Sequence, residues 1–188
     1  MTAVISNNNK IHKQLVYLVS GPNRSGKSRW AEYLMRNEIN VTYIATFENR
    51  YEDLSWQSRI KAHKLRRPDN WNVIESPRDL SYTISELKNK NILIDSIGGF
   101  VFNNLSLDEN EWLQSCNDLI QNIKAHQNII LLVLEETGWD IIPQNKSAIL
   151  FRDRIGELSQ ALNRISTQSW LVVNGRAIDL TNVGIIIP

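Results

Sequence analysis

Five short apolar runs rich in β-branched residues recur along the chain, separated by stretches with helical character. They cover residues 15–19, 41–45, 92–95, 129–134 and 170–173. The runs are apolar almost throughout rather than alternating, which is typical of strands buried on both faces of a parallel sheet. The sequence therefore predicts a doubly wound α/β fold: a mostly parallel sheet with helices on both faces. Residues 73–74, and either 178–180 or 184–187, are weaker strand candidates.

Helices are expected between these runs, over residues 28–37, 53–66, 80–88, 108–126 and 147–165. A chain of 188 residues with 42% hydrophobic residues can bury a sizeable core without disulfides, and Cys116 has no second cysteine to pair with. We expect one domain over residues 15–188, preceded by a polar and disordered leader at residues 1–14.

Charge and hydrophobicity exclude several classes of protein. The chain has 21 Lys and Arg residues against 20 Asp and Glu residues, which argues against a protein that coats nucleic acid or an anionic membrane. A membrane-spanning helix needs about twenty apolar residues, far more than the run at residues 129–134 offers. We therefore expect a cytoplasmic protein with no nucleic-acid partner and no membrane insertion.

A phosphate-binding motif follows the first predicted strand and opens the first predicted helix. The pattern G-x-x-x-x-G-K-[ST] is matched by Gly21, Pro22, Asn23, Arg24, Ser25, Gly26, Lys27 and Ser28. Its glycines let backbone N–H groups turn toward phosphate oxygens, and the helix N-terminus adds a field that favours anions. Lys27 would reach the β- and γ-phosphates, and Ser28 would bind Mg²⁺. The alternative is a glycine-rich surface turn; the motif in this context favours a P-loop NTPase-like fold.

An acidic residue ends the third apolar run. Asp95 would lie at the carboxyl edge of the parallel sheet, where ligands of open α/β folds bind, and is our candidate for holding Mg²⁺. The alternative is a helix cap or a turn residue. Glu135 and Glu136 end the fourth run in the same way and offer a second acidic edge.

A strongly basic segment surrounds one histidine. Residues 59–68 contain five cations and His63, and helical spacing places Arg59, His63 and Arg66 or Arg67 on one face. Arginines there could present a bound phosphate to His63, and surrounding cations would keep its ring neutral and nucleophilic. The alternative is a solvated basic face of a helix.

The order of these motifs resembles the adenosylcobinamide kinase/adenosylcobinamide-phosphate guanylyltransferase family. The resemblance runs from about residue 15 to residue 180. It rests on the strings LVSGPNRSGKSRWAE, YIAT, RIKAHKLRRPDNW, LIDSIGGFVFNNL, EETGWDIIPQN, FRDRIGELSQAL and SWLVVNG. The resemblance implies a bifunctional enzyme of cobalamin biosynthesis that acts as a homotrimer. It would phosphorylate adenosylcobinamide with a nucleoside triphosphate, ATP or GTP, and then transfer GMP from GTP through a guanylyl-histidine.

Matched position by position, the resemblance also implies the site residues. The guanylylated histidine falls on His63. Nucleotide contacts fall on the phosphate loop and on Ala45, Thr46, Phe47, Lys64, Leu65, Arg66, Arg67, Glu75 and Asp95. Mg²⁺ would be held by Ser28 and Asp95.

Two other functions remain open from the residues. One is a phosphate-loop kinase for another small hydroxylated substrate, in which His63 is merely structural. The other is a non-catalytic nucleotide-binding protein whose basic helix touches RNA. The balanced charge and the scattered tryptophans weigh against RNA.

Overall fold

The computed structural model describes residues 15–47, 54–75, 79–139 and 145–187. In chain order the elements are β1 (Val16–Gly21), α1 (Lys27–Met35), β2 (Val41–Ala45), α2 (Leu54–Arg66), β3 (Asn72–Glu75), α3 (Leu80–Glu86), β4 (Asn91–Asp95), α4 (Ile97–Asn103), α5 (Glu109–Ala125), β5 (Ile130–Glu135), α6 (Lys146–Ile165), β6 (Gln168–Val173), β7 (Arg176–Asp179) and α7 (Leu180–Val183). The expected leader at residues 1–14 lies outside the described residues.

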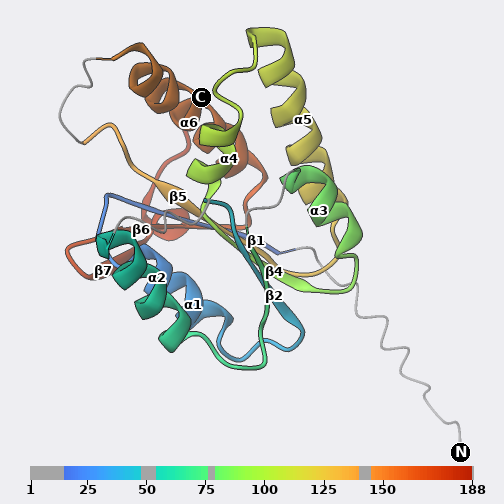
Figure 1. Cartoon of the computed structure of the whole chain (residues 1–188), viewed down its shortest axis with the longest axis vertical. Coiled ribbons are helices and arrows are strands. Elements are labelled where there is room, and N and C mark those ends of the chain that lie inside the picture. The colour runs from blue at the N-terminus through green and yellow to red at the C-terminus, as the bar shows by residue number, and fades with distance from the viewer. Residues whose placement is uncertain (1–14, 48–53, 76–78, 140–144, 188) are drawn as a thin grey trace, which may run out of the picture.

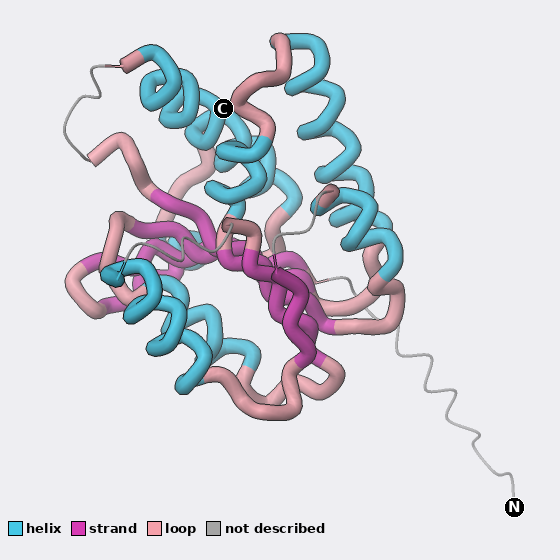
Figure 2. The backbone as a smooth tube through the Cα atoms, viewed as in Figure 1, coloured by secondary structure: helices cyan, strands magenta, loops and turns pink. Residues whose placement is uncertain are grey.

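The strands form one seven-stranded sheet in the order β3-β2-β4-β5-β1-β6-β7. All neighbouring strands are parallel except β6 and β7, which pair antiparallel. Helices cover both faces: α1 and α2 lie on one side, and α3, α4, α5 and α6 lie on the other (Figure 1, Figure 2). The prediction of a doubly wound, mostly parallel α/β fold is confirmed.

The central strands are apolar because both of their faces are buried. Along β4, Ile92 and Ile94 pack toward α3 to α6, whereas Leu93 between them packs toward α1. The same alternation runs along β5, where Leu131 and Val133 share the α1 side. A strand between two helical layers therefore needs apolar residues at every position, which is the pattern that the sequence shows.

The structure differs from the sequence prediction at two places. The α4 helix was not predicted, although it lies directly beyond Asp95. Near the C-terminus, residues 176–179 form β7, so Leu180, expected to end a strand, instead begins the short helix α7. Residues 184–187 have no regular structure, so the second strand candidate there was wrong.

The topology gathers the chemically interesting residues at one edge of the sheet. Because β1, β5, β4 and β2 are neighbours and parallel, their carboxyl ends lie side by side. Gly21 pairs with Glu135, and Asp95 pairs with Ala45. The phosphate loop, the two acidic strand ends and residues 45–47 therefore meet at this edge. No helix among the described residues is long and apolar enough to cross a membrane.

Candidate active site

The loop after β1 has the compact shape that a phosphate-binding turn requires. Gly26 has a φ of 102° and is the N-cap of α1, so the left-handed backbone there favours glycine. Ser25 donates its backbone N–H to the Pro22 carbonyl at 3.2 Å, and Lys27 Nζ donates to the same oxygen at 3.3 Å. The Ser25 hydroxyl is buried without a hydrogen-bond partner among the described residues. A compact loop with a buried hydroxyl that has no hydrogen-bond partner among the described residues is suited to binding an anionic ligand.

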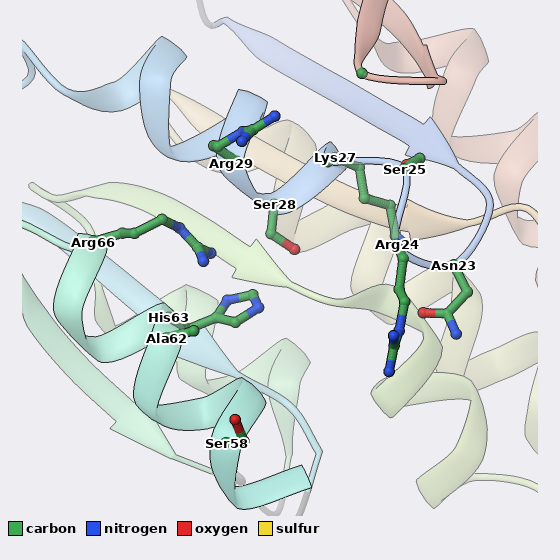
Figure 3. Close-up of a pocket in the computed structure, with 12 residues that line it drawn as sticks. Asn23, Arg24, Ser25, Lys27, Ser28, Arg29, Ser58, Ala62, His63 and Arg66 are labelled. Carbon is green, nitrogen blue, oxygen red and sulfur yellow. The ribbon is translucent and has the colours of Figure 1, made fainter. Parts of the chain in front are cut away.

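A cavity of about 640 Å³ separates this loop from α2. Residues 23–29 form one wall, and Ser58, Ala62, His63 and Arg66 form the facing wall on one side of α2 (Figure 3). The His63 ring points from α2 toward Ser28 and the loop (Figure 3). The structure thus brings the predicted loop and the predicted histidine to one cavity, although 33 residues lie between Arg29 and His63.

Two carboxylates lie beside the His63 ring. Nδ1 of His63 is 3.6 Å from Oδ2 of Asp95 and 3.7 Å from Oε1 of Glu32. The surroundings of the ring are therefore of mixed charge. The expectation that surrounding cations set the state of the ring considered only the residues of α2 and omitted the two carboxylates that α1 and β4 bring to it. The side chain of Arg59 lies outside the described residues.

Glu32 links α1 to α2 through an ion pair in which the carboxylate is buried and the Arg66 side chain is 35% exposed. Its carboxylate is 7% exposed and accepts two hydrogen bonds from Arg66, from Nε at 2.8 Å and from Nη2 at 3.0 Å. Burial raises the pKa of Glu32, and the hydrogen bond and charge of Arg66 oppose that shift. The same hydrogen bond raises the pKa of Arg66. Because His63 lies one turn before Arg66, this pair fixes the part of α2 that carries the histidine.

Asp95 is held by a tyrosine that the sequence analysis did not single out. The Tyr43 hydroxyl donates a 2.7 Å hydrogen bond to Asp95 Oδ2. Burial, followed by the charge of Asp95, raises the pKa of Tyr43 well above its usual value, so the hydroxyl stays protonated as a donor. The Arg67 guanidinium lies 4.2 Å from the centre of the Tyr43 ring. This arrangement fixes one oxygen of the carboxylate at the end of β4.

Glu135 provides a second fixed carboxylate at the same edge. It accepts hydrogen bonds from the Ser96 hydroxyl and, at 3.1 Å, from the Gly98 backbone N–H. Burial raises the pKa of Glu135, while the Ser96 bond and the charge of Lys27 act in the opposite direction. A Cβ at position 98 would collide with the Glu135 carboxylate, so the glycine permits this close contact.

The remaining predicted residues lie near the edge but do not line the loop cavity. Thr46 is buried against Ser96, and the Phe47 ring lies 6.2 Å from that of Phe102. Lys64 pairs with Glu75 at 3.2 Å on the surface. Leu65 is 78% exposed, and Ala45 ends β2 beside Asp95. The sequence analysis missed Glu32; its spacing of four residues from Ser28 on the predicted helix was an available signal.

Comparison with known proteins identifies the family to which the chain belongs. The family model described as cobinamide kinase / cobinamide phosphate guanyltransferase matches residues 17–180. The chain belongs to this family. It is similar to the bifunctional adenosylcobalamin biosynthesis protein CobU of Escherichia coli strain K12, with 34% identity over 86% of this chain and 97% of that protein. The CobP protein of Pseudomonas aeruginosa is 33% identical over 77% of this chain and 85% of its own length.

Solved structures share the fold at much lower identity. An ATPase from the type III secretion system of pathogenic bacteria aligns with a TM-score of 0.57 and 8% identity, over 92% of this chain and 60% of that one. A protein from Pyrococcus horikoshii OT3 aligns with a TM-score of 0.54 and 10% identity, over 88% and 85%. These likenesses show the P-loop NTPase-like fold. Membership of the cobinamide kinase family makes this chain an enzyme of two transfer reactions, phosphoryl and guanylyl.

Proposed function

We propose that the cavity between the phosphate loop and α2 carries out both transfer reactions of the family on adenosylcobinamide. In the first, a hydroxyl of the substrate attacks the γ-phosphorus of ATP or GTP, the bond from that phosphorus to the β-phosphate oxygen breaks, and ADP or GDP and the hydroxyl proton are released. In the second, the new phosphate receives GMP from GTP by way of His63, and pyrophosphate is released. The observation that carries this proposal is the position of His63 on the cavity wall opposite the loop (Figure 3).

The loop residues suit the triphosphate. Backbone N–H groups at the start of α1, the Lys27 ammonium and the buried Ser25 hydroxyl all offer donors to phosphate oxygens. Ser28 and Asp95 supply the hard oxygen donors that Mg²⁺ prefers, and Mg²⁺ takes few protein ligands because substrate phosphates and water complete its shell. When bound, Mg²⁺ would neutralise phosphate charge. Among the described residues, no group of three or more His, Cys, Asp or Glu side chains is arranged to hold a metal ion.

The contacts of His63 suit a nucleophile. The carboxylates of Glu32 and Asp95 lie on the Nδ1 side and favour a proton on that nitrogen, which leaves the lone pair on Nε2. Nε2 would attack the α-phosphorus of GTP: the Nε2–P bond forms, the bridging P–O bond breaks, and pyrophosphate carries away the electron pair. An oxygen of cobinamide phosphate then attacks the same phosphorus and displaces Nε2.

Direct product analysis tests the overall proposal. Purified protein incubated with adenosylcobinamide, GTP and Mg²⁺ should yield adenosylcobinamide phosphate and then adenosylcobinamide-GDP, with pyrophosphate, all identified by mass spectrometry. A protein that binds GTP but forms neither product would contradict the proposal. Formation of the phosphate alone would support the simple-kinase alternative.

Asp95→Asn should raise the Mg²⁺ concentration that gives half-maximal rate, by about tenfold in both steps, because one fixed carboxylate ligand becomes a neutral amide. The amide oxygen can still accept the Tyr43 hydrogen bond, so the fold should persist. Magnesium titrations of each step measure the effect. Asp69→Asn, at an exposed acid beyond α2, is the matched control. Identical titrations for the parent and Asp95→Asn would leave Asp95 as a structural residue only.

Glu32→Gln should slow guanylylation of His63 by about tenfold to a hundredfold, because a nucleophile displaced by even a fraction of an ångström reacts poorly. Glu32 touches His63 and Arg66 but does not line the cavity, so GTP binding should change little. Single-turnover labelling at saturating GTP measures the rate. Glu38→Gln, just beyond α1, is the control, and an unchanged labelling rate in Glu32→Gln would show that the Glu32–Arg66 pair serves stability alone.

We also propose that the chain works in the cytoplasm as a homo-oligomer, a trimer by family resemblance. Apolar side chains at the end of the described chain support an interface between copies: Val183, Ile185, Ile186 and Ile187 are all at least 70% exposed. Analytical ultracentrifugation tests the assembly, and a monomer at micromolar concentration would contradict it.

A further inference from the structure

A second groove, of about 460 Å³, lies between α4 and the two helices α3 and α5. None of its lining residues also lines the loop cavity. Leu80, Phe100 and Leu107 give it an apolar floor. From α5 it receives Glu111, Gln114, Ser115 and Asp118, whose spacing places them on one face of that helix.

The groove is suited to a ligand other than a nucleotide. Its lining includes three carboxylates, those of Asp79, Glu111 and Asp118, and contains no Lys or Arg side chain. Such a surface repels phosphate groups and favours a cationic or neutral ligand. Two of the carboxylates also serve the fold, since Asp79 caps α3 and Glu111 takes part in the capping box of α5.

Three amide side chains add hydrogen-bonding capacity. Asn103 donates to the Thr46 carbonyl at 3.4 Å, Asn104 donates to the Phe100 carbonyl at 2.8 Å, and Gln114 donates to Asp118 at 2.8 Å. Each of these bonds uses one of the two N–H groups of the amide and orients the side chain. Oriented carboxamides can both donate to and accept from the carboxamides of a ligand.

The segment after α4 forms one wall of the groove and is anchored by hydrogen bonds from α6. Arg154 of α6 is buried and donates to the carbonyls of Asn104 and Leu107, both at 2.8 Å. Its guanidinium also lies 4.8 Å from the centre of the Trp112 ring. The groove is therefore bordered by anchored backbone rather than by a loose loop.

The groove begins at the catalytic edge of the sheet. Thr46, at its end, receives a 3.0 Å hydrogen bond from the backbone N–H of Ser96, the residue after Asp95. In the strand order Thr46 follows β2, three strands from the loop after β1. Neighbouring strands are about 4.8 Å apart, so this separation is roughly 14 Å. An acceptor bound here would need to present its hydroxyl on an arm that extends from its main body toward the phosphates.

We infer that this groove binds the acceptor in the kinase step: a cationic, carboxamide-bearing corrinoid that reacts through a hydroxylated side arm. The inference rests on the proposed function. Amide side chains on the corrin rim would meet Asn103, Asn104 and Gln114, and the positive cobalt centre would favour the acidic lining. The nucleotide and the acceptor thus occupy separate pockets: His63 of the loop cavity lies 3.6 Å from Asp95, and Thr46 at the end of the groove contacts Ser96, the next residue.

Two variants with matched controls test this inference in the kinase assay. Ser115→Trp fills the groove, and Asn117→Trp places the same bulk on an exposed position of α5 outside the groove. Asp118→Lys reverses a charge in the lining, and Glu157→Lys makes the same change on exposed α6. We expect Ser115→Trp and Asp118→Lys each to raise the KM for adenosylcobinamide about tenfold or more while the KM for the nucleotide stays unchanged. The two control variants should match the parent.

The outcomes separate failure of this inference from failure of the proposed function. If the parent does not phosphorylate adenosylcobinamide, the proposed function is wrong. If the parent is active and both groove variants keep its KM for adenosylcobinamide, the groove inference is overturned and the proposed function stands. A change in sedimentation of Ser115→Trp with unchanged KM would identify the groove as a contact between copies and would equally overturn the inference. Equilibrium dialysis with adenosylcobinamide, followed by its absorbance, should show weaker binding in both groove variants.

Discussion

Lys27→Ala should lower the rate of adenosylcobinamide phosphorylation by about a hundredfold or more, the scale expected when a fixed cation that stabilises transferring phosphate is removed. Lys27 is the first residue of α1 and lines the cavity directly after the glycine turn. Its ammonium, 3.3 Å from the Pro22 carbonyl, lies within the curl of the loop where phosphate would bind. The same substitution should slow guanylylation, because both steps use one triphosphate site.

The fold should survive Lys27→Ala. Lys27 is only 4% exposed, contrary to the exposed position that a loop lysine suggests, so the substitution removes some packing and the hydrogen bond to the Pro22 carbonyl. That loss costs about 1 kcal/mol of the free energy of unfolding. Thermal melting measures the cost, and transfer of labelled γ-phosphate measures activity. Arg36→Ala, at the exposed end of the same helix, removes one positive charge and should keep full activity. Full kinase activity in folded Lys27→Ala would remove the basis for the loop assignment.

The central sheet could be predicted because strands that are buried on both faces appear in the sequence as continuous apolar runs. A strand such as β5, which is enclosed by helices on both faces, is apolar at nearly every position. A helix or an exposed strand of the same length does not need a continuous apolar run. The α4 helix has no comparable sequence pattern. It is one of the shorter helices and contains Gly98 and Gly99, which are poor helix formers. A Cβ at Gly99 would collide with Thr46, so close packing against this residue, which follows β2, explains the glycine, and that contact appears only in three dimensions.

The candidate site was predictable where function imposes a local pattern. The phosphate loop is contiguous, and its backbone geometry demands glycine at position 26. Glu32 and Tyr43 carry no such pattern: one is a charged residue on a helix and the other an aromatic residue in a strand. Their contacts with His63 and Asp95 arise only because α1, α2, β2 and β4 pack together. The mixed charge around His63 follows from that packing and could not be read from residues 59–68.

His63→Ala should abolish covalent guanylylation and the transfer of GMP. With Mg²⁺ present, GTP labelled at the α-phosphate should mark the parent protein, whereas GTP labelled at the γ-phosphate should not. A bond from imidazole nitrogen to phosphorus should survive alkali and be lost in mild acid, unlike a serine ester or an acyl phosphate. Replacing the ring removes the only nucleophile proposed for this step, so the label should disappear.

The kinase step should largely persist in His63→Ala. Transfer of the γ-phosphoryl group depends on positioning by the loop and charge neutralisation by the metal, and the substrate hydroxyl is its nucleophile. His63 lies on the α2 wall of the cavity and is not part of the loop. Phosphorylation of adenosylcobinamide by His63→Ala should therefore proceed and stop at the phosphate, which would accumulate. Lys61→Ala, an exposed cation two residues earlier on α2, should retain both the label and the final product.

Measuring the two activities separately distinguishes a nucleophilic role of His63 from a structural one. If His63 were structural, its loss would weaken both steps together or neither, because one cavity serves both. Selective loss of the α-label with phosphorylation intact requires an imidazole that reacts at the α-phosphorus. Label retained in His63→Ala, or no label in a parent protein that binds GTP, would contradict the covalent mechanism. The cavity would then be the site of a kinase whose His63 only packs between Glu32 and Asp95.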